Sequence, residues 1–201
     1  MLHQAVLGDG EADFALEDLE GVSSPPSPPG EEPDQPVADC TVFLLGTLRA
    51  LRLRRLRGCT VVAAAVAGSA FVDSALRCTM HLAARQVRIH DVEDTDFYLV
   101  RRGSAAQRRP PGTESAAARQ RVRSHPIIEG TTRVRFAPYA FSHAAVCAAQ
   151  AAAGLGPADE AAWRDAWAQV DDFAWLRVSQ SPNWALLPEG ERSAAPGVSV
   201  E

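Results

Sequence analysis

The sequence predicts a mainly β protein folded as a parallel β-helix, a solenoid with about 19–20 residues in each coil. Cysteine recurs at Cys40, Cys59 and Cys78, in steps of 19 residues, and threonine follows it each time. From residue 39 onwards, short apolar runs alternate with turn-like or charged residues, and no 3.6-residue period holds over a long window. Stacked coils would place residues 19 apart side by side at about 4.8 Å. The expected columns include Cys40 with Cys59, Cys78 and Phe97, and Leu51 with Ala70 and Ile89.

The repeated cysteines allow three interpretations: metal ligands, disulfides or buried core residues. No pair has the CxxC spacing typical of zinc sites. The N-terminus lacks a basic segment followed by an apolar one, so we expect no signal peptide and a cytoplasmic location, where thiols stay reduced. Association with the cytoskeleton is left open. The favoured prediction is a buried ladder of free cysteines, because cysteine is often fully buried as a small apolar residue.

The N-terminal residues 1–38 are expected to form a disordered, acidic and proline-rich segment. Residues 1–39 hold ten acidic residues and no Lys or Arg. The stretch SSPPSPPGEEPDQP suits neither helix nor strand, because proline interrupts both. The preceding stretch, ADFALEDLEGV, is long enough for a short amphipathic turn or two.

The charge balance differs between this segment and the rest of the chain. The net charge is −5, yet residues 40–201 hold all 20 basic residues, every one an arginine, against 15 acidic ones. A mildly basic body suits an acidic partner better than a basic one, and it does not predict nucleic-acid binding. No apolar run approaches the length that a membrane-spanning helix needs, so no membrane span is expected.

Residues 101–124 interrupt the strand pattern and are expected to be an inserted, exposed loop. They contain seven Arg and one Glu, with PPG in the middle. The loop arginines Arg101, Arg102, Arg108 and Arg109 could dock on an acidic partner or simply be solvated.

The strand pattern returns at HPIIEGTTRVRFAPY, and two helices are then expected over about 142–172. Trp163, Trp167 and Val170 have the spacing of one helical face, which would pack on the solenoid or bind a partner. Residues 185–201 are expected to be a flexible tail.

Four stretches carry a family resemblance: GSAFVD, RCTMHLAARQVRIHDVEDTDFYL, HPIIEGTTRVRFAPY and VDDFAWLRVSQSPNW. In this order they resemble the C-terminal domain of the tubulin-folding cofactor C family, over residues 39–184 without the arginine-rich loop. The resemblance implies a right-handed parallel β-helix with helices packed on it. It also implies a function: stimulation of GTP hydrolysis by tubulin, in a complex with tubulin cofactors D and E, which releases folded tubulin dimers.

The family's characteristic motif is Gln-Gln-x-Arg-x-His. In this sequence Arg88 falls on the arginine finger, Gln86 on the second glutamine in a supporting role, and His90 on the histidine. Arg85 replaces the first glutamine, and this departure from the motif leaves a non-catalytic interaction module as an alternative. Arg88 could instead be an ordinary surface ion-pairing residue, Gln86 a solvated residue, and His90 either a partner contact or a structural hydrogen-bonding residue.

Three further residues are assigned by position. One 19-residue coil beyond Arg88, corrected for an insertion of about 22 residues, is Glu129, which is therefore predicted to stack beside Arg88 and orient its guanidinium. Phe136 and Pro138 are candidate partner contacts, with core and turn roles as the alternative.

No cofactor and no metal are expected on this chain, which has no Walker A motif; GTP and Mg²⁺ would belong to the partner. The expected state is a monomer. Two alternative functions stay open: a GTPase activator for an Arf-like small GTPase, and a non-catalytic cytoskeletal interaction module. The N-terminal helical domain usual in this family does not fit residues 1–39, so the sequence is expected to be a partial chain, a shortened relative or a member that docks differently.

Overall fold

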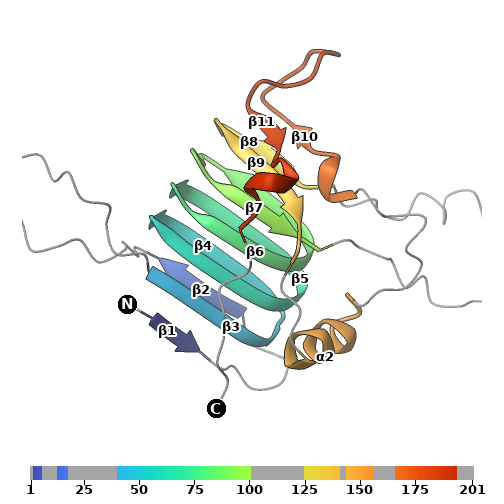
Figure 1. The fold of residues 1–201 in the computed structure, drawn as a ribbon. Coiled ribbons are helices and arrows are strands. Elements are labelled where there is room, and N and C mark those ends of the chain that lie inside the picture. Colours follow the sequence, from blue (N-terminus) through green and yellow to red (C-terminus); the bar gives the residue numbers. More distant parts are fainter. Residues whose placement is uncertain are drawn as a thin grey trace, which may run out of the picture.

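The computed structural model describes residues 2–5, 13–17, 40–100, 125–140, 144–155 and 166–193. Within these ranges the chain is a parallel β-helix, as predicted, and every strand pair is parallel (Figure 1). No helix in the described ranges is long and apolar enough to cross a membrane.

The strands form two stacks that share two long central strands, β5 (Cys59–Leu76) and β6 (Thr79–His90). The first stack uses the early halves of β5 and β6. Its other strands are β1 (Leu2–Ala5), β3 (Cys40–Leu48), β7 (Asp96–Leu99), β9 (Val134–Pro138) and β11 (Trp184–Leu186). The second stack uses the late halves of β5 and β6. Its other strands are β2 (Asp13–Glu17), β4 (Ala50–Arg57), β8 (Ile127–Glu129) and β10 (Asp171–Asp172).

The two stacks meet at a bend where the ladder between β5 and β6 shifts register twice, between Ala63 and Val66 and again between Val66 and Ser69. A Cβ on Gly68 would lie 2.5 Å from the Arg49 carbonyl oxygen, so glycine is needed for this close backbone approach. The bend lets one long strand serve both stacks.

Left-handed residues mark two further corners, and each corner forms a column with one such residue per coil. One column holds Arg55, Ser74, Asp91 and Gly130, and the other holds Gly58, Arg77, Asp94 and Arg133. The backbone bonds Gly58 N to Leu76 O, Arg77 N to Glu93 O and Asp94 N to Thr132 O link successive coils at the second corner. The corners therefore stack as regularly as the strands do.

The predicted coil length holds for the first coils and is wrong further along. Cys40 pairs with Cys59 and Thr60 with Thr79, but Thr79 pairs with Asp96, a step two residues shorter than the predicted one. The two register shifts explain the difference, because β5 spends two more residues at its bend than β6 does. As a result Phe97 lies beside Met80 rather than Cys78, and Ala70 pairs with Val87 rather than with Ile89.

The cysteine ladder is confirmed as part of the core. Cys40, Cys59 and Cys78 are buried and free. The Cys59 thiol donates to the Arg57 carbonyl and the Cys78 thiol to the Leu76 carbonyl, each at 3.3 Å, so the same contact repeats in successive coils. Burial among apolar residues favours packing over chemistry for these thiols.

The N-terminal prediction is wrong in two places, since residues 2–5 and 13–17 form β1 and β2. Strand β2 pairs with β4 and sets Phe14 beside Leu51 and Leu16 beside Leu53. This alternation of apolar residues matches the two-residue period of a strand, and pairing satisfies the backbone groups on the edge of β4. The remaining residues of the predicted segment lie outside the described residues.

The first C-terminal helix is confirmed as α2 (Ala144–Ala152), which packs against β3 and β5 through buried Val146. Of the second, the structure describes only the 3-10 turn η1 (Ala166–Ala168), where Trp167 joins the main core. Trp163 and the predicted loop 101–124 lie outside the described residues.

The predicted flexible tail is wrong as far as Ser193. Leu186 ends β11, Leu187 is fully buried, and the 3-10 turn η2 (Glu189–Glu191) follows. The Ser193 amide donates to the Tyr98 hydroxyl at 2.8 Å. The burial of Leu187 and this hydrogen bond fix the segment on the first stack.

Candidate functional site

The candidate site lies on the outer face of the second stack, on the late half of β6. Side chains alternate along a strand, so Gln86, Arg88 and His90 face outward while Val87 and Ile89 face the core. Val87 is 6% exposed and Ile89 is 2% exposed. Arg88 is exposed, and its two outward neighbours are half-buried. The structure therefore brings the three motif residues together on one open face.

Arg88 stands between two apolar side chains. In register it pairs with Phe71 of β5 on one side and with Ile127 of β8 on the other. The guanidinium carbon of Arg52, in the next strand, lies 5.4 Å from the centroid of the Phe71 ring. Within the described ranges, Arg88 has no hydrogen-bond or ion-pair partner. Its charge is therefore available to a ligand, and its stem is flanked by apolar groups.

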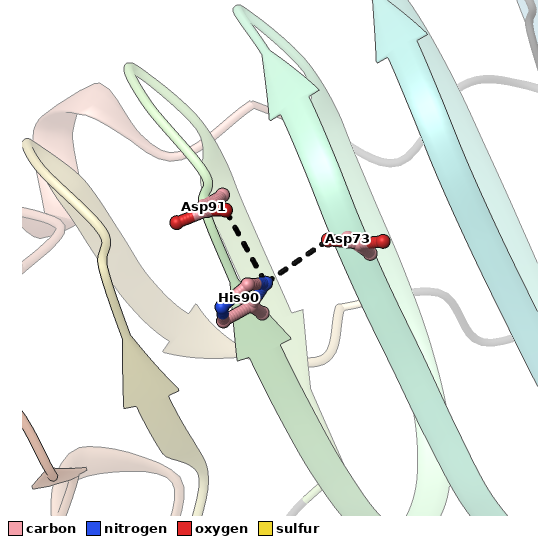
Figure 2. Close-up of side chains that lie close together, drawn as sticks. All are labelled: Asp73, His90 and Asp91. Carbon is pink, nitrogen blue, oxygen red and sulfur yellow. Dashed lines mark hydrogen bonds and ion pairs between the residues drawn. The ribbon is translucent and has the colours of Figure 1, made fainter.

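His90 belongs to a charged row that crosses the same face. The row runs from Arg54 of β4 through Asp73 of β5 and His90 to Glu129 of β8. His90 Nδ1 lies 3.1 Å from Asp73 Oδ1 and 3.4 Å from Asp91 Oδ2, and Figure 2 shows the imidazole reaching both carboxylates. Arg54 Nε donates to the other Asp73 oxygen at 3.0 Å. The row thus alternates in charge along the stack.

The pKa shifts in this row follow its contacts. The hydrogen bond to Asp73 raises the pKa of His90 above its ordinary value, and the carboxylates of Asp91, Asp73 and Glu129 add to the effect. The hydrogen bond from His90, together with Arg54, lowers the pKa of Asp73. Both shifts favour an ion pair between a protonated imidazole and a carboxylate.

Potential ligand atoms of the same three side chains, Asp73, His90 and Asp91, lie within 4.8 Å of one another, which is close enough to surround a cation. Arg54 and His90 each already bond one oxygen of Asp73. Their positive charges therefore neutralise the carboxylate that would attract a metal ion. The contacts therefore favour a hydrogen-bonded network over a metal centre. The absence of a metal stays a prediction.

The predicted contact between Glu129 and Arg88 is wrong in register. Ile127 occupies the position beside Arg88, and Glu129 pairs with His90. The error of two residues has the same origin as the wrong coil length, because the coils here advance by two residues fewer than predicted. Glu129 stays on the site face, where its charge acts on His90.

The two glutamine positions of the motif have different surroundings. Gln86 pairs in register with Ser69, whose hydroxyl donates to Gln86 Oε1 at 3.2 Å, which leaves the Nε2 amide to donate elsewhere. Arg85 instead donates from Nη2 to the Ala153 carbonyl at the end of α2, at 3.0 Å. The residue that replaces the first glutamine is thus engaged with the helix that covers the first stack.

The remaining two predicted contacts do not join this face. Phe136 is fully buried, stacked on Phe97 at 5.6 Å and edge-on to Trp184 at 6.0 Å, so its prediction as a partner contact is wrong. Along β9 it alternates with the outward residues Arg135 and Ala137, so it points into the core together with Val134. Pro138 is half-buried and pairs with Leu99 in the first stack, apart from Arg88.

Sequence reasoning missed Phe71, Asp73 and Arg54. Phe71 and Asp73 lie one coil before Arg88 and His90, and Arg54 lies one coil before Asp73. The coils differ in length, so a constant step of 19 residues does not align these residues with the motif. A register allowing the shorter coil would have placed Phe71 beside Arg88 and Asp73 beside His90.

Comparison with known proteins agrees with this geometry. The tubulin binding cofactor C family matches residues 35–106, which include Gln86, Arg88 and His90. Tubulin-folding cofactor C of Arabidopsis thaliana is 42% identical over 153 residues, which are 76% of this chain and 37% of the relative. Tubulin-specific chaperone C of Mus musculus is 33% identical over 157 residues, 78% of this chain and 38% of the relative. Residues 35–106 of this chain therefore belong to the tubulin binding cofactor C family.

The chain spans little more than a third of the length of these curated cofactor C relatives. The solved structure of tubulin binding cofactor C from Leishmania major matches with a TM-score of 0.55 at 21% identity, covering 77% of this chain and 90% of that one. That likeness supports the cofactor C β-helix fold independently of the motif.

Proposed function

We propose that this domain acts in tubulin folding by stimulating GTP hydrolysis on tubulin, with Arg88 as an arginine finger supplied to the partner's nucleotide site. One observation carries the proposal: in a cofactor C chain, the motif arginine is exposed and lies between Phe71 and Ile127 with no partner of its own within the described ranges. The setting is a complex with tubulin cofactors D and E, from which hydrolysis releases folded tubulin dimers.

The chemistry explains why an arginine suits this role. Phosphoryl transfer spreads negative charge over the γ-phosphate oxygens and the bridging oxygen. A planar guanidinium is always charged and offers several donors in a fixed arrangement, so it neutralises this charge where it develops. An arginine finger is typically worth about 10³–10⁵ in rate.

The fold holds Arg88 on a rigid strand and places apolar side chains on both sides of it. Arg88 lies near the end of β6, where that strand is paired on both sides, so its backbone position is set by the neighbouring strands β5 and β8. The apolar neighbours Phe71 and Ile127 would press on the partner's surface and reduce water around the guanidinium, which strengthens its interaction with phosphate. A finger on a sheet is also placed more accurately than one on a loop.

Two neighbours on β6 assist in this proposal. Gln86 has its carbonyl oxygen engaged by Ser69, so its amide nitrogen can donate to the partner or to the attacking water. His90 is oriented by Asp73 and would contact the partner beside Arg88. GTP and Mg²⁺ are held by the partner, and this chain acts as a cytoplasmic monomer.

The test is GTP turnover by αβ-tubulin in the presence of cofactors D and E. Adding the wild-type chain should raise turnover, and Arg88→Ala should remove about 10³-fold or more of the stimulation. Arg57→Ala is the matched control, because it removes another exposed arginine of the second stack, away from the Arg88 row. Arg88→Lys should recover little, because an ammonium cannot reproduce the planar fork.

Three results would contradict the proposal. Equal stimulation of GTP turnover by Arg88→Ala and by the wild type would show that Arg88 is not an arginine finger. Stimulation of an Arf-like GTPase and not of tubulin would favour a different partner. Binding without any stimulation of GTP turnover would favour a non-catalytic interaction module.

A further inference from the structure

The segment between β10 and β11 exposes apolar side chains to an unusual degree. Four large apolar residues are exposed within the described ranges, and all of them lie between positions 173 and 186. Leu176 is 95% exposed and Val178 is 109% exposed, so neither side chain touches the body of the solenoid to any extent. Such a concentration of exposed apolar surface typically marks an interaction site.

This segment, residues 173–183, is held in shape by its own hydrogen bonds. The Asp172 carboxylate accepts from the Ala174 amide at 3.0 Å, from the Asn183 side-chain amide at 2.8 Å and from the Ser181 hydroxyl. These bonds close the base of the segment around one carboxylate. The exposed residues are therefore presented by an ordered turn.

The tip is organised around a tryptophan. Trp175 donates from its indole Nε1 to the Ser179 carbonyl at 2.8 Å, and the Arg177 guanidinium carbon lies 4.8 Å from the centroid of its ring. These two contacts turn the backbone so that Leu176 and Val178 project outward. A hollow of about 400 Å³ lies along the segment, and Trp175 and Trp184 are among the residues that line it.

The turn begins on the same sheet as Arg88. Asp171 pairs with Ile127, which pairs with Arg88, so the base of the turn is two strands, roughly 10 Å, from the finger. The Phe173 amide donates to the Ile128 carbonyl at 3.0 Å and continues this pairing. Figure 1 shows the segment between β10 and β11 extending beyond the last coil. A globular partner that covers Arg88 would meet it.

We propose that residues 173–180 are a docking arm, whose Leu176 and Val178 insert into an apolar depression on the tubulin subunit whose GTP Arg88 reaches. The inference rests on the proposed function, since the occupant is identified by continuity of the arm with the Arg88 face. The arm supplies affinity and the finger supplies rate. Because burial of a Leu or Val side chain is worth more than one factor of ten in binding, two such residues have a large share in the affinity of the interface.

The double variant Leu176→Ser, Val178→Ser tests the arm. Both side chains are solvent-exposed, so the variant should keep the wild-type unfolding temperature. We expect the concentration for half-maximal stimulation of tubulin GTP turnover to rise at least about tenfold, with the maximal rate at saturation unchanged. The matched control Leu176→Met, Val178→Ile keeps the apolar area and should keep the wild-type half-maximal concentration.

Arg88→Ala should show the opposite pattern, with the maximal rate lost and direct binding to αβ-tubulin retained. The inference is overturned if the serine variant binds αβ-tubulin as tightly as wild type, or if sedimentation shows that the arm instead joins two copies of this chain. If the serine variant weakens binding while Arg88→Ala leaves turnover intact, the docking arm stands and the proposed finger fails. If Arg88→Ala abolishes stimulation while the serine variant behaves as wild type, the arm alone fails.

Discussion

The two outer faces of the solenoid are built from the same long strands and differ in what covers them. On the first stack, the outward row that contains His81 is buried: Leu187, which follows β11, packs on Tyr98 and Ala137, and α2 lies against β3 and β5. The members of this row are Phe43, Val62, His81, Tyr98 and Ala137. On the second stack, the row of Arg88 is open.

The comparison shows that one strand can place one histidine in a buried environment and another on an open, charged face a few residues further along. Both His81 and His90 belong to β6. His81 stacks on Tyr98 with ring centroids 4.3 Å apart, and burial lowers its pKa to about 4. His90 lies beside Asp73, and its pKa is raised. A face left uncovered keeps its charges available, and that is the face with the motif.

The largest expected effect comes from removing an aromatic residue of the covered face. Tyr98→Ala should lower the free energy of unfolding by about 3–5 kcal/mol, because it opens a cavity under Leu187 and removes the hydrogen bonds to Ser193. Phe71→Ala on the open face should cost about 1 kcal/mol. Urea unfolding of both variants measures the difference, and equal losses would contradict the contrast between the faces.

The second prediction uses the opposite pKa shifts of the two histidines. His81 has a folded pKa of about 4, below its ordinary 6.5, so its neutral form stabilises the fold. Its contribution is complete above pH 6.5 and is lost as the pH falls through 4, by up to about 3 kcal/mol. His81→Phe should therefore flatten the acid loss of stability measured by urea unfolding between pH 7 and pH 4.

His90 should behave in the reverse sense. Its folded pKa is raised, so its contribution to stability is complete below pH 6.5 and is lost as the pH rises through the folded value. Asp73→Asn should move the pKa of His90 back toward its ordinary value, which NMR titration of the imidazole protons can measure. Asp91→Asn is the control with a smaller expected shift, since Asp73 is the main cause. An unchanged pKa of His90 in Asp73→Asn would contradict the ion pair between Asp73 and His90.

The smallest expected effect concerns Arg85. Replacing it with glutamine should remove its bond to the Ala153 carbonyl and cost about 1 kcal/mol of stability, which thermal unfolding can detect. Stimulation of GTP turnover should change less than for Gln86→Ala, whose amide lies on the site face. A large gain in stimulation by Arg85→Gln would show that this position acts in the site after all.

The sequence was sufficient to predict the fold class, because the cysteine steps and the short apolar runs reflect direct contacts between coils. The family motif also predicted which residues of β6 share the open face, namely Gln86, Arg88 and His90, while the role of Arg88 as a finger stays a proposal. The sequence was insufficient for the register beyond Cys78, since nothing in the local residue pattern marks the two extra residues at the bend of β5. The same gap misplaced Glu129 and concealed Asp73.

The terminal segments were missed for a different reason. Strands β2 and β11 are short, and isolated strands of three to five residues are not stable without a neighbour. The 3-10 turn η2 that follows β11 is equally short. Their order depends on the exposed edge of β4 and on the surface of Tyr98, which exist only once the solenoid has formed. Local propensity therefore predicted disorder where tertiary pairing gives structure.

The register across residues 101–124 has a practical consequence. The chain from Arg88 to Ile127 is about twice as long as one coil, yet the two strands pair as neighbours, just as Phe97 and Phe136 do in the first stack. In both stacks the strands after residue 124 pair directly with the strands before residue 101. The number of residues in 101–124 therefore does not change the spacing of the coils. A reporter protein or an affinity tag spliced between Arg109 and Pro110 should leave Arg88 and residues 173–180 in place, which makes this junction suitable for labelling the chain in the tests of GTP turnover proposed above.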